Sequence, residues 1–434
     1  MRTVTKPGKP SKPSKPSKSS KPSKPSKPRW KAVLLGITLT VAVCAWAGQA
    51  RAAGFLIYEL SGEAVARGSA VSADVNEPAA VWFNPAALSF SEGIHASAGG
   101  VFVTAKSRFS PAASGTDDVT SKRGNFVLPT LFASGRVNDR VAVGMGVYTA
   151  FGIGVKWPSD WLGRESAISA SLQTVAFNPA VSFKLHPRLS VAVGFDAVRG
   201  VVDFSNGLPV LVGGDVRLAG AAWGYGGNAG LLYQAVPDLL HLALTYRSRV
   251  RLKFDGRADF RPANPDFGPA LPDQPGTATI TLPDIITVGV MGRPRADLAL
   301  TAEASLVLWS TYDRIDIDFQ SAPNRSIVPH GRNAFTVRAG ADWTTRWPGL
   351  HLRGGLIFDQ AAVTGQNLGP GLPDANRIGG ALGAGYARGH FKVDVGYLLV
   401  YCLPAEATGG REGPAGTYYT LAHLVALTVA ASWP

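Results

Sequence analysis

The sequence predicts an all-β fold, a transmembrane antiparallel β-barrel of about fourteen strands whose lumen is plugged by an N-terminal hatch of short helices. Segments of about ten residues that alternate apolar and polar side chains recur from residue 93 to the end. Short and long connections alternate between these segments, which is typical of periplasmic turns and extracellular loops. Residues 53–92 do not alternate and are rich in small side chains, which indicates a plug and not a barrel wall.

The positive charge of the chain is concentrated at its N-terminus. The 434 residues carry a formal charge of +13, but residues 1–52 hold twelve Lys and Arg and no acidic residue. The remainder holds 31 basic and 30 acidic residues. Because the basic excess lies in a segment that we expect to be removed, the high net charge does not indicate nucleic-acid binding.

Residues 1–52 have the parts of a secretory signal peptide, preceded by a Ser-Lys-Pro-rich extension. The apolar core Ala32–Trp46 is shorter than the roughly 20 residues that a membrane-spanning helix needs. Ala50-Arg51-Ala52 matches an A-x-A cleavage site, so we expect the mature chain to begin at Ala53.

The expected hatch, residues 53–92, starts with an apolar tip and ends in a compact turn, Asn84-Pro85-Ala86. We interpret this turn as structural, because Asn caps or turns the backbone and Pro fixes φ.

Fourteen strand candidates follow the hatch along residues 93–434, with Gly, Pro, Asn and Asp between them. They are 94–106, 125–136, 140–151, 171–185, 189–204, 218–234, 239–254, 277–291, 297–311, 334–345, 350–359, 376–388, 390–402 and 418–433.

Alternation is sharp in three stretches: 335–343, 391–397 and 246–254. In each, one face is apolar and the other carries charged residues and glycines, which fits an apolar face toward lipid and a polar face toward a lumen. A soluble sandwich shows the same alternation, and the signal peptide and strand number favour the membrane. On this interpretation, one stretch lines the lumen with a basic ladder: Arg247, Arg249, Arg251 and Lys253. The ladder either attracts the carboxylate of a substrate or, as we favour, pairs with acidic side chains such as Asp316 and Asp318.

The final strand alternates up to a terminal aromatic residue, Trp433, followed by Pro434. Such an ending resembles the signal that the outer-membrane barrel assembly machinery reads, so we expect that machinery to be a partner.

No pattern predicts catalysis, a cofactor or a metal site. The seven histidines are scattered without metal-ligand spacing, and no G-x-S-x-G motif is present. Gly380–Gly385 mimics a dinucleotide fingerprint, but it lies in a strand pattern without a following helix. Cys44 follows the bulky Val43, which argues against a lipoprotein signal, and Cys402 alone remains after cleavage, so no disulfide forms within the mature chain.

Several short motifs resemble outer-membrane long-chain fatty-acid transporters of the FadL type. The predicted mature start Ala53-Gly54-Phe55 and the Asn84-Pro85-Ala86 turn come first. The remaining matches, in the order of that family, are Asn138-Asp139-Arg140, Tyr148–Gly152, Trp223-Gly224-Tyr225, Asn228-Ala229-Gly230, Ala243–Ser248, Thr281–Asp284, Trp309-Ser310, Phe358-Asp359 and Pro373–Arg377.

The resemblance implies a monomeric passive transporter in the outer membrane of a Gram-negative bacterium, surrounded by membrane lipid and lipopolysaccharide. It implies that hydrophobic substrate binds against the tip of the hatch and leaves sideways through a kinked third strand. Fatty acids are the main substrates of the family, and some relatives pass aromatic hydrocarbons. An outer-membrane lipase is the alternative from another functional class. For substrate binding the resemblance implies Phe55, Leu56 and Ile57, together with basic wall residues that it does not place; we take Arg199 and Arg332 as the candidates. The residues for the kinked exit are Phe151, Gly152 and Gly154.

We predict that cleavage follows Ala52, because the A-x-A motif immediately precedes the Ala-Gly-Phe start. N-terminal sequencing of protein taken from outer membranes should read Ala-Gly-Phe. A sequence that starts at Met1, or a lipid on Cys44, would show that the assignment is wrong.

Overall fold

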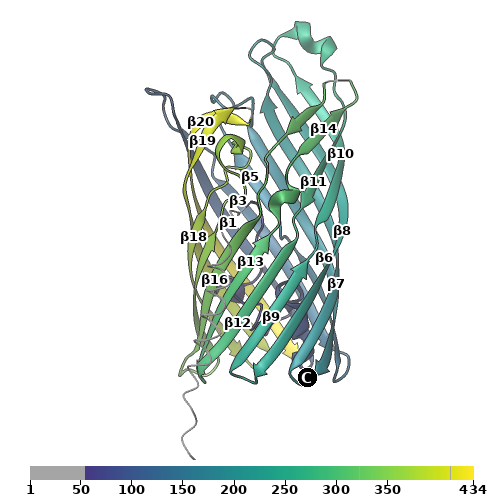
Figure 1. Cartoon of the computed structure of the whole chain (residues 1–434), viewed down its shortest axis with the longest axis vertical. Helices are drawn as coiled ribbons and strands as arrows, with labels where there is room; N and C mark the ends of the chain where they lie inside the picture. Colours follow the sequence, from purple (N-terminus) through teal and green to yellow (C-terminus); the bar gives the residue numbers. More distant parts are fainter. Residues whose placement is uncertain (1–53, 322, 411) are drawn as a thin grey trace, which may run out of the picture.

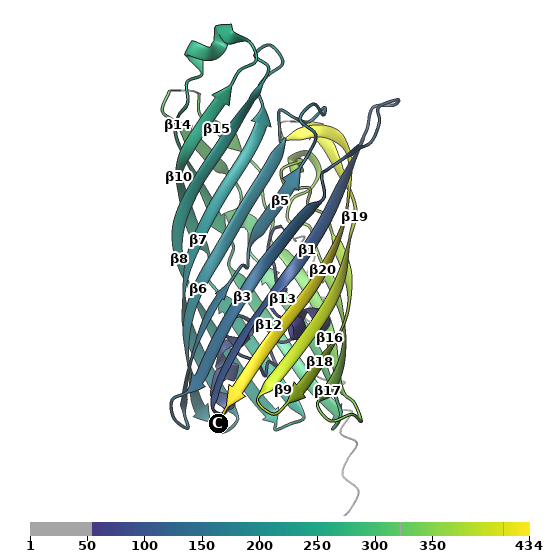
Figure 2. The same cartoon turned by 180° about the vertical axis from the view of Figure 1, so that it is seen from behind.

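The computed structural model describes residues 54–321, 323–410 and 412–434. It confirms a closed antiparallel barrel of fourteen strands around a lumen that holds the N-terminal segment (Figure 1). Each of the fourteen is here called a stave, whether it is continuous or interrupted into two segments. The first strand, β1, pairs along its whole length with the last, β20, which closes the barrel (Figure 2). The predicted signal peptide and cleavage site lie outside the described residues and stay predictions.

Twenty strand segments build the fourteen staves, because six staves are each interrupted into two segments: β2 with β3, β4 with β5, β9 with β10, β11 with β12, β13 with β14, and β15 with β16. The segments are β1 (Ile94–Pro111), β2 (Val119–Thr120), β3 (Gly124–Arg136), β4 (Val141–Tyr148), β5 (Gly152–Lys156), β6 (Ser169–His186), β7 (Leu189–Gly207), β8 (Asp215–Val236), β9 (Leu240–Arg247), β10 (Val250–Arg261), β11 (Gln274–Leu282), β12 (Ile285–Arg295), β13 (Leu298–Val307), β14 (Ile315–Phe319), β15 (Arg325–Ile327), β16 (Ala334–Thr344), β17 (Leu350–Asp359), β18 (Arg377–Arg388), β19 (Phe391–Gly410) and β20 (Gly413–Trp433).

The helices of the described residues are short. They are α2 (Gly62–Ala66), α3 (Ala80–Phe83) and the 3₁₀ turns η1 (Pro85–Phe90), η2 (Pro265–Ala270), η3 (Trp309–Thr311) and η4 (Gly365–Asn367). None of the helices in the described residues is both long and apolar enough to cross a membrane.

In two of the three stretches with sharp alternation, the apolar side chains face outward and the polar side chains face the lumen, as predicted. In β19, Phe391, Val393, Val395 and Tyr397 are exposed on the outer face, while Asp394 is fully buried. In β16, Thr336 and Arg338 are buried against the hatch and Trp343 is exposed. The apolar outer face and polar inner face match a barrel surrounded by lipid.

In the third stretch, 246–254, the inward and outward faces exchange at Ser248-Arg249. The prediction of a basic ladder in the lumen is therefore wrong for Arg251 and Lys253. Arg247 faces inward in β9, but in β10 the buried side chains are Val250, Leu252 and Phe254, and Arg251 and Lys253 point outward. Asp316 and Asp318 of β14 are likewise exposed on the outer face. These four charged residues form no lumenal lattice.

A one-residue register shift causes this inversion. Along β8, Asn228 pairs with Arg247 of β9, but Ala221 pairs with Asp255 of β10, so seven residues on one side face six on the other. One extra residue in a strand is a β-bulge, and it moves every following side chain to the opposite face. Asp284 braces the interruption by accepting hydrogen bonds from the Tyr246 hydroxyl (2.7 Å) and from the Arg249 N–H (3.1 Å).

The hatch packs in the lower part of the lumen through α2, α3 and η1. Ser61 caps α2 by accepting a hydrogen bond from the Ala64 N–H (3.1 Å). Helix α2 lies against β17–β20, and η1 lies against β6 and β7. Asn84 begins η1: its Oδ1 accepts from the Ala86 N–H (3.1 Å), and its Nδ2 donates to the carbonyls of Ser72 (3.0 Å) and Leu231 (3.2 Å).

Buried ion pairs join the hatch to the wall. Within the hatch, Arg67 bridges Glu63 (3.1 Å) and Asp74 (2.8 Å). From the wall, Arg353 contacts Glu63 (3.4 Å), and Lys392 also contacts Glu63. Removing one partner of a buried pair costs about 3–5 kcal/mol, because the other charge is left uncompensated, so this network fixes the body of the hatch.

Glu77 lies beside this network without a basic partner of its own. Its Oε1 accepts a hydrogen bond from the Ser61 hydroxyl (2.5 Å), and its Oε2 has no hydrogen-bond partner among the described residues. Burial, reinforced by the nearby carboxylates of Glu63 and Asp394, raises the pKa of Glu77 to about 7, although Lys392 opposes the shift.

We predict that the barrel loses thermal stability as the pH rises from about 4.5 to 7, because the unfolded Glu77 releases its proton over that range while the folded side chain retains it. A shift of this size corresponds to roughly 2–4 kcal/mol. Glu77→Gln should flatten the pH dependence of Tm in detergent, whereas Glu92→Gln, at an exposed carboxylate, should leave it unchanged. Equal pH profiles for wild type and Glu77→Gln would contradict the assignment.

Candidate functional site

The site begins at an interruption in the third stave, between β4 and β5. The ladder between β3 and β4 ends at Leu131 and Val147, and β5 pairs with β6. Above Leu131, among the described residues, a single backbone hydrogen bond ties the two neighbours, from the Lys122 N–H to the Lys156 carbonyl (2.7 Å). The wall therefore has an opening between the upper half of β3 and β5.

The tip of the hatch is hydrogen-bonded into this interruption. The Ile57 N–H donates to the Ala150 carbonyl (2.8 Å), and the Gly152 N–H donates to the Phe55 carbonyl (3.0 Å). Leu56 and Phe151 form an isolated antiparallel bridge. Because buried backbone groups need partners, the interrupted stave accepts the hatch tip as a short extra strand.

Three aromatic side chains pack around the Phe55 ring. Its ring makes edge-to-face contacts with Trp309 (4.7 Å between centroids), Tyr312 (5.3 Å) and Phe151 (6.2 Å), a favoured geometry for aromatic pairs. Gly54 has φ +59°, and a Cβ there would overlap the Trp309 ring. Glycine is thus required next to Phe55 for two independent reasons, backbone conformation and space.

A buried carboxylate fixes the start of the tip. Asp374 Oδ2 accepts hydrogen bonds from the backbone N–H groups of Gly54 (3.2 Å), Ala362 (2.6 Å) and Val363 (3.1 Å). Arg377 donates to the Gly54 carbonyl (2.7 Å). Burial raises the pKa of Asp374, although Arg377 and these three N–H groups oppose the shift.

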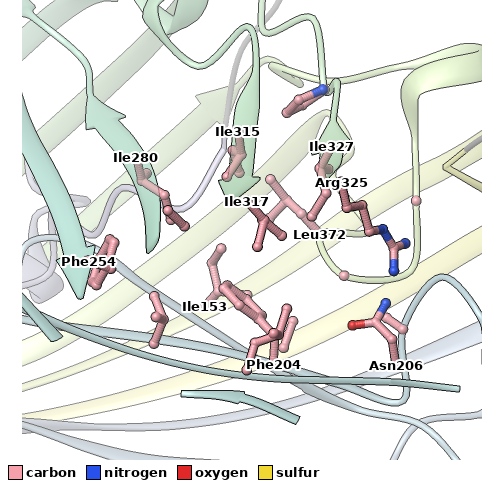
Figure 3. A pocket seen from close by; sticks show the side chains of 18 of the residues that line it. Ile153, Phe204, Asn206, Phe254, Ile280, Ile315, Ile317, Arg325, Ile327 and Leu372 are labelled. Atoms are coloured by element: carbon pink, nitrogen blue, oxygen red, sulfur yellow. The ribbon is translucent and has the colours of Figure 1, made fainter. Parts of the chain in front are cut away.

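A cavity of about 140 Å³, here called the outer cavity, lies toward the extracellular end (Figure 3). Its wall is mainly apolar and comes from several strands and loops: Ile153, Phe204, Phe254, Ile280, Ile315, Ile317, Ile327 and Leu372. Figure 3 shows Arg325 and Asn206 at one side, away from Phe254 and Ile280. The outer cavity therefore has an apolar body and a polar end.

The register shift in β10 creates this apolar lining. It turns Phe254 inward, and β11 and β14 contribute Ile280, Ile315 and Ile317 to the same surface. Without the shift, Arg251 and Lys253 would occupy the inner face of β10.

A second cavity of about 640 Å³, here called the inner cavity, lies beyond the hatch tip. Residues of the tip line it, together with β1, β3, β5 and β17–β20. Phe55, Ile153 and Leu372 line both cavities and so stand between them.

The inner cavity reaches the opening in the wall, and the ring of Phe126 occupies that opening. A Cβ on Gly154 of β5 would overlap this ring, and one on Gly124 would lie 2.7 Å from it. Gly154 thus leaves room for an aromatic ring that fills the space between the two strands. Val127, the next residue, points outward and is 69% exposed.

The structure brings together most of the residues expected at the site. Phe55, Leu56 and Ile57 line the inner cavity, as do Gly152 and Gly154, and Phe151 contacts Phe55. Asn84, Pro85 and Ala86 are buried deeper in the hatch, where they shape its fold.

The two basic residues expected at the site do not line either cavity. Arg199 lies on the outer face of β7, with its guanidinium over the exposed Trp223 ring (5.7 Å), because Val198 and Gly200 on either side of it are the inward residues. Arg332 is exposed and bonds through its side chain to Thr364. The expectation for Arg199 is wrong, and Arg332 sits near the site without reaching a cavity.

Sequence reasoning missed Trp309, Tyr312, Phe126, Asn206 and Arg325. Trp309 falls inside the expected strand 297–311, but β13 ends at Val307, and Trp309 and Tyr312 lie in and directly after the turn η3. Arg325 belongs to a three-residue strand in a long connection. No periodic signal marks such positions, and the Trp309-Ser310 motif alone pointed to one of them.

Three hatch and wall carboxylates, Glu63, Glu77 and Asp394, lie close enough together to suggest a cation site. The Lys392 ammonium contacts Glu63 and lies 3.2 Å from Asp394 Oδ2, so a lysine already supplies positive charge there.

Comparison with known proteins gives a consistent picture. Residues 43–413 match the family model described as outer membrane protein transport protein (OMPP1/FadL/TodX). The long-chain fatty acid transport protein of Escherichia coli K12 is 25% identical over 433 residues, covering 88% of this chain and 95% of that protein. Outer membrane protein P1 of Haemophilus influenzae Rd is 25% identical over 414 residues, covering 83% and 89%.

Solved structures show the same fold. A Pseudomonas aeruginosa FadL homologue superposes with a TM-score of 0.80 at 20% identity, covering 88% of this chain and 100% of that one. The Pseudomonas putida toluene transporter TodX superposes with a TM-score of 0.68 at 18% identity, covering 89% and 99%.

Proposed function

Because the chain belongs to the OMPP1/FadL/TodX family of outer-membrane transport proteins, we propose that it carries long-chain fatty acids across the outer membrane. The substrate enters the outer cavity, passes the Phe55 tip into the inner cavity, and leaves sideways between β3 and β5. Family membership makes the protein a transporter and not an enzyme, which sets the lipase alternative aside.

One observation carries this proposal: two largely apolar cavities in series, separated by a side chain that belongs to the hatch and not to the wall. Phe55 is held by aromatic contacts and by the few hydrogen bonds of the tip. Each such hydrogen bond contributes about 0.5–1.5 kcal/mol net, so the tip costs less to displace than the ion-paired body of the hatch.

The polar end of the outer cavity supports an amphiphilic substrate. A carboxylate needs a basic or hydrogen-bonding partner when it enters an apolar site, and Arg325 with Asn206 offers one at the end opposite Phe254. Among the relatives, one is named a long-chain fatty acid transport protein and another a toluene transporter. An aromatic hydrocarbon would use the apolar body but not the polar end.

The opening between β3 and β5 supports a sideways exit. It lies above the periplasmic end of the barrel, because β3 residues 124–130 pair with β1 residues 99–105, the middle of that strand. A hydrophobic solute that passes from protein to lipid avoids exposing its apolar surface to water, which would cost about 25 cal/mol per Å².

The first test addresses the substrate. Arg325→Gln should weaken binding of a long-chain fatty acid by about tenfold and leave binding of its uncharged methyl ester unchanged, because the ester lacks the anionic group. Fluorescent-ligand displacement in detergent measures both affinities. Arg295→Gln, at an exposed residue paired with Asp297, is the control. Equal loss for acid and ester, or tight binding of toluene only, would contradict a fatty-acid substrate.

The second test addresses the route. Phe55→Ala should weaken fatty-acid binding by roughly one to two decades, since a buried Phe contributes about 1.5–3 kcal/mol. Gly152→Trp should retain binding and block transport into vesicles, because the indole fills the opening beside Ile57.

Phe126→Ala should speed release from the inner cavity, whereas Val193→Ala, at an outward residue of β7 that is 56% exposed and lines neither cavity, should have no effect. All of these variants should assemble as heat-modifiable barrels. Wild-type transport by a correctly assembled Gly152→Trp variant would exclude the sideways exit.

A further inference from the structure

A groove of about 340 Å³ lies on the outer face of the barrel near its extracellular end, across β1, β20 and β19. Figure 2 shows these three strands side by side, with β20 in the middle. Ala105, Ser107 and Thr420 of the barrel wall line both this groove and the inner cavity, so the wall alone separates the two. The groove is here called the rim groove and is defined by six of its lining residues, which are three basic and three aromatic: Lys106, Arg108, Arg123, Tyr401, Tyr419 and His423.

The rim groove faces away from the lumen. Along β1, Lys106 and Arg108 are exposed and alternate with Ser107 and Phe109, which are buried. On the neighbouring strands, Tyr401 and Leu421 are both more than 40% exposed. The basic groups therefore lie on the same surface as the apolar residues that meet lipid.

The height of the groove matches the edge of the bilayer. Twelve residues separate Ile94, at the periplasmic end of β1, from Lys106. With about 3.4 Å per residue and a strand tilt of about 40°, Lys106 lies about 31 Å above Ile94, just beyond an apolar band about 25 Å tall. The outward residues below the groove on β1 and β20 are apolar: Phe102, Val425, Leu427 and Val429.

The side chains of the rim groove favour an anion that carries several oxygen atoms. Arg108 pairs with Asp118 (3.0 Å) and stacks on Tyr419 (4.4 Å from guanidinium carbon to ring centroid). Among the described residues, Lys106 and Arg123 have no ion-pair partner, so the groove keeps excess positive charge. Lysine and arginine bind phosphate through short charge-assisted hydrogen bonds, and tyrosines at membrane interfaces pack beside lipid headgroups.

We propose that the rim groove binds the phosphate of a lipid A headgroup in the outer leaflet. A soluble phosphate would use the charges alone, whereas a lipid also uses the continuous apolar strip directly beneath them on β1 and β20. The acyl chains of the bound lipid run down that strip toward the membrane centre.

The rim groove lies one strand away from the proposed sideways exit. The acyl chains run along β1 and β20, and β3 separates these strands from the opening between β3 and β5. Lipid binding at the rim groove can therefore be tested independently of transport.

The experiment measures lipid binding and does not depend on transport. Delipidated full-length mature protein in detergent is titrated with bis-phosphorylated lipid A, with enzymatically dephosphorylated lipid A and with inorganic phosphate. Native mass spectrometry reports the bound mass. We expect lipid A to bind, the dephosphorylated form to bind at least tenfold more weakly, and millimolar inorganic phosphate not to compete.

Lys106→Gln/Arg108→Gln/Arg123→Gln should weaken lipid A binding at least tenfold. The matched control Arg251→Gln/Lys253→Gln/Arg261→Gln removes three outward basic residues from β10 and should bind as wild type. Equal affinity of the two triple variants, equal binding of dephosphorylated lipid A, or displacement by millimolar phosphate would each overturn the proposal. Fatty-acid binding by the rim-groove variant should stay unchanged, so a failure of the transport proposal shows separately in the Phe55→Ala and Gly152→Trp variants.

Discussion

The one-residue register shift between β8 and the stave of β9 and β10 determines which part of the lumen is charged and which part is apolar. Below it, Arg247 faces inward and pairs with Asp196, within the charged floor that holds the hatch. Above it, Phe254 faces inward, and Arg251 and Lys253 point outward. A barrel strand has two faces, so an extra residue exchanges both at once. The same bulge therefore provides an apolar cavity inside and charged residues outside, at a height beyond the apolar band of the membrane.

The hatch is held by two different kinds of interaction, and their difference gives it a fixed body and a displaceable tip. Buried ion pairs between Glu63, Arg67 and Arg353 anchor the body, and each of these groups has more than one oppositely charged partner. The tip is held by a few backbone hydrogen bonds and by the rings around Phe55. A ligand that supplies apolar contacts in place of Phe55 can compensate for their loss, which it cannot do for the ion pairs.

The glycines of β5 matter because they have no side chain, more than because of their backbone conformation. The kink in the third stave arises where residues 149–151 leave the ladder and pair with the hatch tip. Gly154 lies after that point, and its missing side chain makes room for Phe126. The opening is therefore filled by one side chain from the neighbouring strand and not by a continuous ladder, and one rotamer change or one substitution alters it.

The sequence alone determined the barrel, because alternation is a local property that period-2 geometry imposes on every strand. The non-alternating leader predicted the hatch, and the family resemblance pointed to the tip residues Phe55–Ile57. It also placed the kink near Gly152. Only the tertiary structure decided which face of β10 lines the lumen, because a bulge is defined by the partner strand and leaves no mark in its own sequence. The same holds for Trp309, Tyr312 and Arg325, which reach the site from turns and a short hairpin, and for Arg199, which alternation on β7 sends outward. Their positions follow from closure of fourteen staves around the hatch, a constraint that joins residues hundreds of positions apart.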